Sequence, residues 1–169
     1  MDWDAIGAIG EVVAAAAVLV TLVFLTIQIR QNTKSVHSAT RSRITETMSN
    51  TLATLQAPGF SDLLARGAGP DYESLSPGEE LEFRSYCFRL FRVLEDGWFQ
   101  REHGEYDLEG WESNRNYLLD MLQYPGFLWF FQSRKHWFDA RFVHYVEEEL
   151  QNFKPTADLS YIDRINSPE

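Results

Sequence analysis

Hydrophobic residues fill the N-terminal part of the chain without a break. The apolar stretch runs from Ala5 to Ile29, and the eighteen residues from Val12 to Ile29 contain no charge, no Pro and no Gly. As an α-helix, eighteen residues rise about 27 Å, which is close to the hydrocarbon thickness of a bilayer. Apolar residues occupy all sides of this helix instead of one stripe. We therefore expect a transmembrane helix within residues 1–32, and not a buried helix of a soluble core.

The charges on either side of this stretch predict that it is not cleaved as a signal peptide, and they also predict its orientation in the membrane. A signal peptide begins with basic residues, whereas Asp2 and Asp4 precede this stretch and the first basic residue is Arg30. All 15 Lys and Arg lie at or after residue 30. By the positive-inside rule, we expect the N-terminus outside and the C-terminal domain in the cytoplasm, with Trp3 at the outer interface.

The small and polar residues of the span follow alternating steps of four and three, which places them on one side of a helix with a heptad seam. Val18 and Leu25 are the larger apolar members of this side. Small residues let helix backbones approach closely, and Thr or Gln can hydrogen-bond across the contact. We therefore expect the protein to assemble with itself around this side. We call it the axis face, and its members are Gly7, Glu11, Ala14, Val18, Thr21, Leu25, Gln28 and Asn32.

Glu11 is the ionisable residue of this face, and two interpretations of it stay open. An acidic side chain inside a span is costly and is by default a functional candidate. In a symmetric oligomer, one Glu11 from each copy would form a ring at the outer mouth that attracts cations. Alternatively, Glu11 lies at headgroup depth near the helix N-terminus, where the helix dipole stabilises a negative charge.

The helical pattern continues beyond the span. Neither Pro nor Gly occurs between Gly10 and Pro58, so one helix from about Asp4 to Gln56 is predicted, although the many Ser and Thr of residues 31–50 are mediocre helix formers. Residues 33–57 form the predicted helical extension. Its apolar stripe is expected to hold the later helices, and this stripe consists of Ile44, Met48, Leu52 and Leu55.

Residues 58–154 predict a cytoplasmic domain of helices, and 155–169 a tail of low helix potential. Breaks fall at Pro58-Gly59, at Gly67–Pro70, which we expect to be a loop after a short helix Phe60–Arg66, and at Tyr124–Gly126. Ser76, Pro77 and Glu79 form a capping box for a helix to about Glu102, and Asp107 is the expected N-cap of the next. The last helix is expected to begin near Asp139. Since no β-alternating run of useful length occurs, the predicted fold class is all-α.

The helix that begins at Ser76 has an apolar stripe of Phe83, Cys87, Leu90 and Leu94. We expect four more apolar residues to widen this buried stripe, namely Leu81, Phe88, Phe91 and Trp98. The later run from Phe127 to Phe138 is crowded with aromatic residues. With Arg134 and Lys135 it could rest on a membrane surface, but a domain this small needs the rings for its core, and we expect the core.

Charge and cysteine content exclude several classes of function. The net charge of the chain is −10, and residues 30–169 contain 15 basic and 22 acidic residues. Nucleic acid is therefore not an expected partner. The basic residues Arg30, Lys34, Arg41 and Arg43 suit anionic membrane lipid. Cys87 is the single cysteine, which excludes an intramolecular disulfide and agrees with a reducing cytoplasm.

Candidate chemistry is sparse. Glu102 and His103 are adjacent, His136 and His144 are eight residues apart, and neither H-E-x-x-H nor E-x-x-H occurs. Nucleophile elbows and phosphate-binding glycine motifs are also missing from the sequence. Cys87 lies in an apolar stripe, which favours a structural role. We therefore expect no enzyme, no catalytic residue, no metal and no cofactor.

Glu95 is the most interesting acid of the domain, because it shares a helix face with Phe88, Phe91 and Trp98. A buried carboxylate needs a partner, and Arg92, Arg115 and Arg141 are the candidates. We expect Glu95 to form a buried polar clamp between helices, with a binding-site acid as the alternative.

Two motifs flank the apolar stretch, W-x-x-I-G-x-I-G-E at Trp3–Glu11 and Q-I-R-Q-N-T at Gln28–Thr33. With further matches at Pro77–Glu80, Glu95–Tyr106 and Pro125–Trp129, they resemble a family of small bacterial single-span membrane proteins of unknown function. The resemblance covers most of the chain before Pro155. It implies a location in the bacterial inner membrane and no established activity.

Three hypotheses of function follow. The first is a homo-oligomer, channel-like or a scaffold, with the axis face on the symmetry axis. The second is a membrane-tethered binding or regulatory module that recognises a partner protein or lipid. The third, an enzyme, is the weakest because these spacings do not assemble a cleft with converging polar groups.

Overall fold

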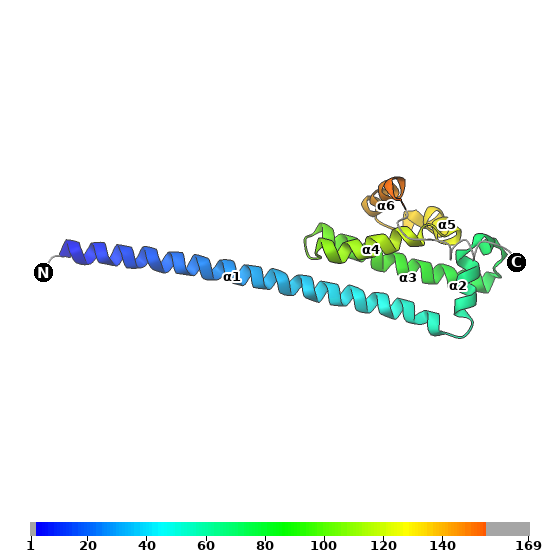
Figure 1. Ribbon diagram of the computed structural model, residues 1–169, viewed down its shortest axis with the longest axis horizontal. Helices are drawn as coiled ribbons and strands as arrows, with labels where there is room; N and C mark the ends of the chain where they lie inside the picture. Colours follow the sequence, from blue (N-terminus) through cyan, green and yellow to red (C-terminus); the bar gives the residue numbers. More distant parts are fainter. Residues whose placement is uncertain (1–2, 155–169) are drawn as a thin grey trace. The chain divides into compact units, whose positions relative to one another are not determined.

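The computed structural model describes residues 3–154, apart from the side chains of residues 4–6 and 8 (Figure 1). The predicted tail 155–169 and Asp2 lie outside the described residues. Within the described range the protein has six α-helices, three short 3-10 helices and no strand, so the predicted all-α fold is confirmed. The elements are α1 (Trp3–Leu52), η1 (Ala53–Gln56), α2 (Phe60–Ala68), η2 (Pro70–Ser74), α3 (Pro77–Glu102), α4 (Leu108–Met121), α5 (Pro125–Arg134), η3 (Lys135–Trp137) and α6 (Ala140–Asn152).

α1 is a single helix of 50 residues that η1 extends to Gln56, which matches the predicted end of the long helix. The Thr residues of its middle part do not interrupt it, because their hydroxyls bond to carbonyl groups one turn earlier. Thr33 Oγ1 donates to the Ile29 carbonyl at 3.0 Å, and Thr47 Oγ1 donates to the Arg43 carbonyl at 2.9 Å. Such bonds satisfy the hydroxyl donors within the helix, although they stabilise it little.

The contacts of the chain divide it into two compact units, Met1–Ala39 and Thr40–Glu169. The division falls inside the predicted extension 33–57, so the last part of α1 belongs to the helical domain. There its apolar stripe packs as expected: Ile44 is buried in the core, and Met48 and Leu55 pack against the core. An ion pair of 3.1 Å between Arg43 and Asp96 also joins α1 to α3.

α3 begins at the predicted capping box. The Ser76 hydroxyl accepts the Glu79 N–H at 3.4 Å, Glu79 Oε2 accepts the Ser76 N–H at 2.9 Å, and Pro77 is the first helical residue. The capping box satisfies two backbone donors that a helix N-terminus otherwise leaves unpaired.

The core side of α3 is narrower than expected. Its stripe of Phe83, Cys87, Leu90 and Leu94 is buried, as are Phe91 and Trp98. The prediction that Leu81 and Phe88 face inward is wrong, because Leu81 is 68% exposed and Phe88 is 37% exposed. Each residue turns the helix by about 100°, so Leu81 and Phe88 lie well away from the line of Phe83 and Cys87.

Two glycines allow α2 to pack closely against its neighbours. α2 continues through Gly67 to Ala68, two residues further than expected. The predicted break near Tyr124 falls between α4 and α5, and Pro125 is the first residue of α5. A Cβ atom on Gly126 would lie 1.7 Å from the Gly67 carbonyl oxygen, and one on Gly67 would lie 2.6 Å from the Phe83 ring. A side chain at Gly126 would therefore force α5 away from α2, and one at Gly67 would collide with the Phe83 ring of α3.

The aromatic run belongs mainly to the core, as expected. Phe127, Phe130 and Phe131 are buried, and the Phe91 ring stacks on Phe130 and Phe131 with centroid distances of 5.7 Å and 5.5 Å. Trp137 departs from this pattern, since 46% of it is exposed.

We expect Gly126→Ala to lower the free energy of unfolding by about 1–3 kcal/mol, the usual range for an overpacked contact. Gly78→Ala is the matched control: it lies in the first turn of α3, where a Cβ would meet no atom within 4 Å, and it should leave stability unchanged or raise it. Thermal unfolding of the purified full-length chain measures both. Equal melting temperatures for the two variants would contradict the close contact of α2 and α5.

The capping box should also appear in the pH dependence of stability. The hydrogen bond from Arg66, followed by the Ser76 hydroxyl and N–H, lowers the pKa of Glu79 from 4.5 to about 2. Because the folded-state pKa is depressed, this contribution to stability is complete above about pH 4.5 and is lost as the pH falls towards 2. Between these pH values, the melting temperature of Glu79→Gln should fall less than that of the wild type. Glu73→Gln, a change at an exposed acid in η2, should follow the wild type.

Candidate functional site

The axis face of α1 is exposed along its whole length. Thr21 Oγ1 donates to the Ala17 carbonyl at 2.9 Å, so its hydrogen is used within the helix while its oxygen can still accept a bond from another molecule. A Cβ on Gly7 or Gly10 would meet nothing within 4 Å. Contacts among the described residues therefore do not require glycine at these two positions.

The apolar side chains of the same region are also uncovered. α1 is the one helix of the described chain that is long and apolar enough to cross a membrane, and none of its most apolar 18-residue window is buried. A core helix of a soluble protein is mostly buried by its neighbours. The exposed apolar surface of α1 therefore fits a membrane span better than a core helix.

Glu95 lies on α3 with 2% of its side chain exposed. One carboxylate oxygen accepts the N–H of Asp139 at 2.6 Å, and the other pairs with Arg92. Asp139 is the N-cap of α6, so this buried carboxylate links α3 to the start of α6. Of the three candidate partners, Arg92 supplies the charge. Arg115 pairs with Glu149, and Arg141 with Asp139.

The other candidate residues offer little chemistry. Cys87 is fully buried, and burial raises the pKa of its thiol well above the usual range, which keeps the thiol protonated and poorly nucleophilic. His136 and His144 line one hollow together with Glu147. Within residues 3–154, however, no group of three or more His, Cys, Asp or Glu side chains is placed to hold a metal ion.

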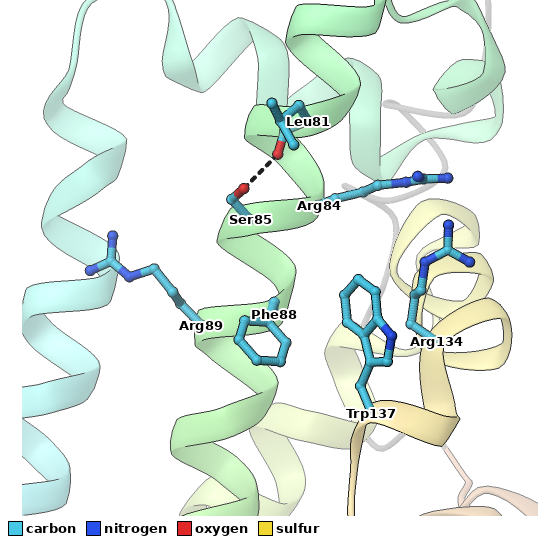
Figure 2. Close-up of a pocket in the computed structure, with 7 residues that line it drawn as sticks. All are labelled: Leu81, Arg84, Ser85, Phe88, Arg89, Arg134 and Trp137. Atoms are coloured by element: carbon cyan, nitrogen blue, oxygen red, sulfur yellow. Dashed lines mark hydrogen bonds between the residues drawn. The ribbon is translucent and has the colours of Figure 1, made fainter.

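The exposed apolar residues of the helical domain point to a site that the sequence did not indicate. A hollow of about 350 Å³ opens between α3 and the end of α5 with η3 (Figure 2). Phe88 and Trp137 form one wall, with ring centroids 5.6 Å apart and the rings edge to face. We call it the arginine hollow, and it is lined by Leu81, Arg84, Ser85, Phe88, Arg89, Arg134 and Trp137.

Two of its arginines lie over aromatic rings. The guanidinium carbon of Arg134 is 5.4 Å from the centre of the Trp137 ring, and that of Arg84 is 5.0 Å from the centre of the Trp129 ring. Both side chains extend to the same side of α3, whereas Arg89 points to the other side (Figure 2). Stacking on a ring orders a guanidinium while leaving its N–H groups free to bind an anion.

The sequence carried one signal for this site. Leu81, Arg84 and Phe88 recur at helical spacing, but such spacing also fits a core stripe, and the pattern alone predicts that Leu81 and Phe88 face inward. Trp137 comes from an element far away in sequence, which no local pattern connects to α3.

Comparison with protein-family models, with curated proteins and with solved structures finds no match to this chain. The resemblance of Trp3–Glu11 and Gln28–Thr33 therefore stays a prediction, and function has to be argued from the geometry of the chain itself.

The Glu95 clamp predicts a large stability effect. Glu95→Ala leaves the Asp139 N–H unpaired and removes the partner of Arg92, so we expect the free energy of unfolding to fall by about 2–4 kcal/mol. Asp96→Ala, which breaks the exposed pair with Arg43 one residue further on, should cost less than about 1 kcal/mol. Chemical denaturation of the full-length chain measures both changes. Similar losses in the two variants would mean that the buried pair is no stronger than an exposed one.

Proposed function

We propose that this protein is a single-span membrane protein that assembles with itself through the axis face of α1 and so forms a channel-like or scaffold oligomer. One observation carries the proposal: the axis face of α1, from Gly7 to Asn32, is exposed in the described chain, and its small and polar residues share one side. Over 25 residues from Gly7 to Asn32, the helical turn returns almost to the same side, so the seam is continuous.

On the side of α1 opposite the axis face, Leu19 and Val23 are 64% and 61% exposed, and in this proposal they contact the lipid bilayer. Lipid tails solvate such residues as well as a protein core does, so they supply no drive for association. Close backbone packing at Gly7, Gly10 and Ala14 supplies that drive. The Thr21 oxygen and the Gln28 amide can add hydrogen bonds between copies.

The oligomer would be channel-like if its axis stayed open. Glu11 from each copy would then form an acidic ring at one end, and Gln28 and Asn32 a polar ring at the other. A seam closed by Val18 and Leu25 would give a scaffold without a pore. In both forms the span lies in an inner membrane, with the N-terminus outside and the helical domain in the cytoplasm, as the distribution of Lys and Arg favours.

A membrane-tethered binding module is the second candidate. The observation that favours it is the arginine hollow, which is concave, largely apolar and lined by three cations. Ligand sites commonly combine these features. This function does not need self-association, so the two candidates can be separated by experiment.

The axis face can be tested by cysteine cross-linking in membranes. Single substitutions Ala14→Cys and Thr21→Cys should give at least several-fold more oxidative cross-linking than Leu19→Cys and Val23→Cys, because sulfur atoms must come within about 2 Å to bond. Cys87 is buried, so the parent chain should give a low background.

Equal cross-linking at all four positions would refute this choice of face. The mass of the wild-type chain in nanodiscs then separates the versions of the proposal. Five or more copies would permit an axial pore, whose ion flux should depend on Glu11→Gln. A dimer would support the scaffold without a pore, and a monomer would support the membrane-tethered binding module.

A further inference from the structure

The apolar residues that the helical domain exposes are gathered in one place. Within the described part of the domain, the large apolar residues with substantial exposure are Leu81, Phe88, Leu108 and Trp137. Three of these four line the arginine hollow. A clustered apolar patch beside polar residues marks an interaction surface, whereas scattered apolar residues are ordinary.

The charge of the hollow is opposite to that of the domain around it. Residues 40–169 contain 13 Lys and Arg and 22 Asp and Glu, yet the hollow is lined by three Arg and by no acid. Its positive charge is therefore local. Low-dielectric walls such as Phe88 and Trp137 strengthen the attraction between these cations and an anion.

The donors of these arginines are not all used. Arg84 pairs with Glu80 at 2.7 Å, but its Nε is buried and has no hydrogen-bond partner among the described residues. Arg134 donates to the Ser133 carbonyl at 3.1 Å, and no carboxylate of the described chain lies within ion-pair distance of Arg134 or Arg89. Arg134 and Arg89 would thus offer an anion N–H groups that no acid of the described chain has neutralised, whereas Arg84 already shares its charge with Glu80.

We propose that the arginine hollow binds the headgroup of an anionic phospholipid, with the phosphate against Arg84 and Arg134 and the glycerol and first acyl carbons against Leu81, Phe88 and Trp137. A free inorganic anion would leave these three apolar side chains in water, so the combination of arginines and apolar wall favours an anion with an apolar body. The choice of phospholipid as that body rests on the proposed membrane anchoring, because lipid is then the most concentrated such anion.

The residues suit this ligand by their type and position. Arginine binds phosphate in a fork with two N–H groups, and exposed Trp and Leu side chains partition into the interface between headgroups and acyl chains. Because Arg134 stacks on Trp137, a phosphate-binding side chain and an apolar side chain lie next to each other in the hollow. Lipid binding at the hollow does not require self-association of α1, so the two proposals can be tested independently.

The test uses the full-length chain in detergent micelles and counts retained lipids by native mass spectrometry. Dioctanoyl phosphatidylglycerol, its phosphatidylcholine counterpart and inorganic phosphate are titrated separately. We expect phosphatidylglycerol to bind in preference to the other two. The double substitution Arg84→Gln/Arg134→Gln should weaken that binding about tenfold or more, since each basic residue contributes separately to attraction by anionic lipid.

Two matched controls isolate the hollow. Arg101→Gln/Arg141→Gln removes the same charge from two arginines that do not line the hollow, and Arg141, like Arg134, lies over an aromatic ring. This variant should therefore bind lipid as the wild type does. Leu81→Ser should weaken binding several-fold, while Leu108→Ser should not, although the two leucines are equally exposed at 68% and 67%. The leucine pair keeps the test valid if the arginine variant fails to fold.

Equal binding by the hollow variants and their controls would overturn the proposal and assign any retained lipid to the span. Inorganic phosphate that binds as tightly as phosphatidylglycerol would overturn it as well, since the hollow would then be a plain anion site. The same spectra report the number of copies in the assembly, so a failure of self-association is distinguished from a failure of lipid binding.

Discussion

Between Ile9 and Ile29, α1 carries large apolar side chains that no other part of the described chain covers, each of them between 46% and 69% exposed. Exposing such surface to water costs roughly 25 cal/mol for each Å², so a stretch of this length needs an apolar environment. The proposed membrane anchoring and the proposed self-association both derive from this constraint.

The helical domain is organised around α3 by contacts of a different kind. One side of α3 is fully buried against aromatic rings of α5 and α6, and the buried carboxylate of Glu95 binds the first backbone N–H at the start of α6. At the other end, Gly67 and Gly126 bring the α2 and α5 backbones into contact. These contacts position η3 beside α3, and this arrangement leaves Trp137 facing Phe88 at the surface.

The arginine hollow follows from where the core ends. The rings of Phe130, Phe131 and Phe138 pack on Phe91. By contrast, Leu81 stays 68% exposed, and Phe88 stays 37% exposed although it contacts the rings of Trp137 and Phe138. The exposed apolar residues of the hollow lie beside its arginines, and this combination underlies the proposed binding of an amphipathic anion.

Features that depend on neighbours in the sequence were predicted well. Helix formation and capping are local, so these features follow from spacing within a few residues. They are the apolar run Val12–Ile29, the uninterrupted helix to Gln56, the capping box at Ser76, the N-cap Asp107 and the start of the last helix near Asp139. The burial of Glu95 among aromatic residues, with Arg92 one turn away as a charged partner, also follows from the pattern of one helix.

Only the tertiary structure decided which apolar residues stay uncovered and which backbones touch. The stripe of α3 alone does not show that Leu81 and Phe88 lie outside the core. Their coverage depends on the positions of α5 and η3, and α5 begins 37 residues after Phe88 in the sequence. The contact of Gly67 with Gly126 and the pairing of Glu95 with the Asp139 N–H are set in the same way. Spacing along one helix determines which side a residue occupies, and the packing of distant elements determines whether that side is core or surface.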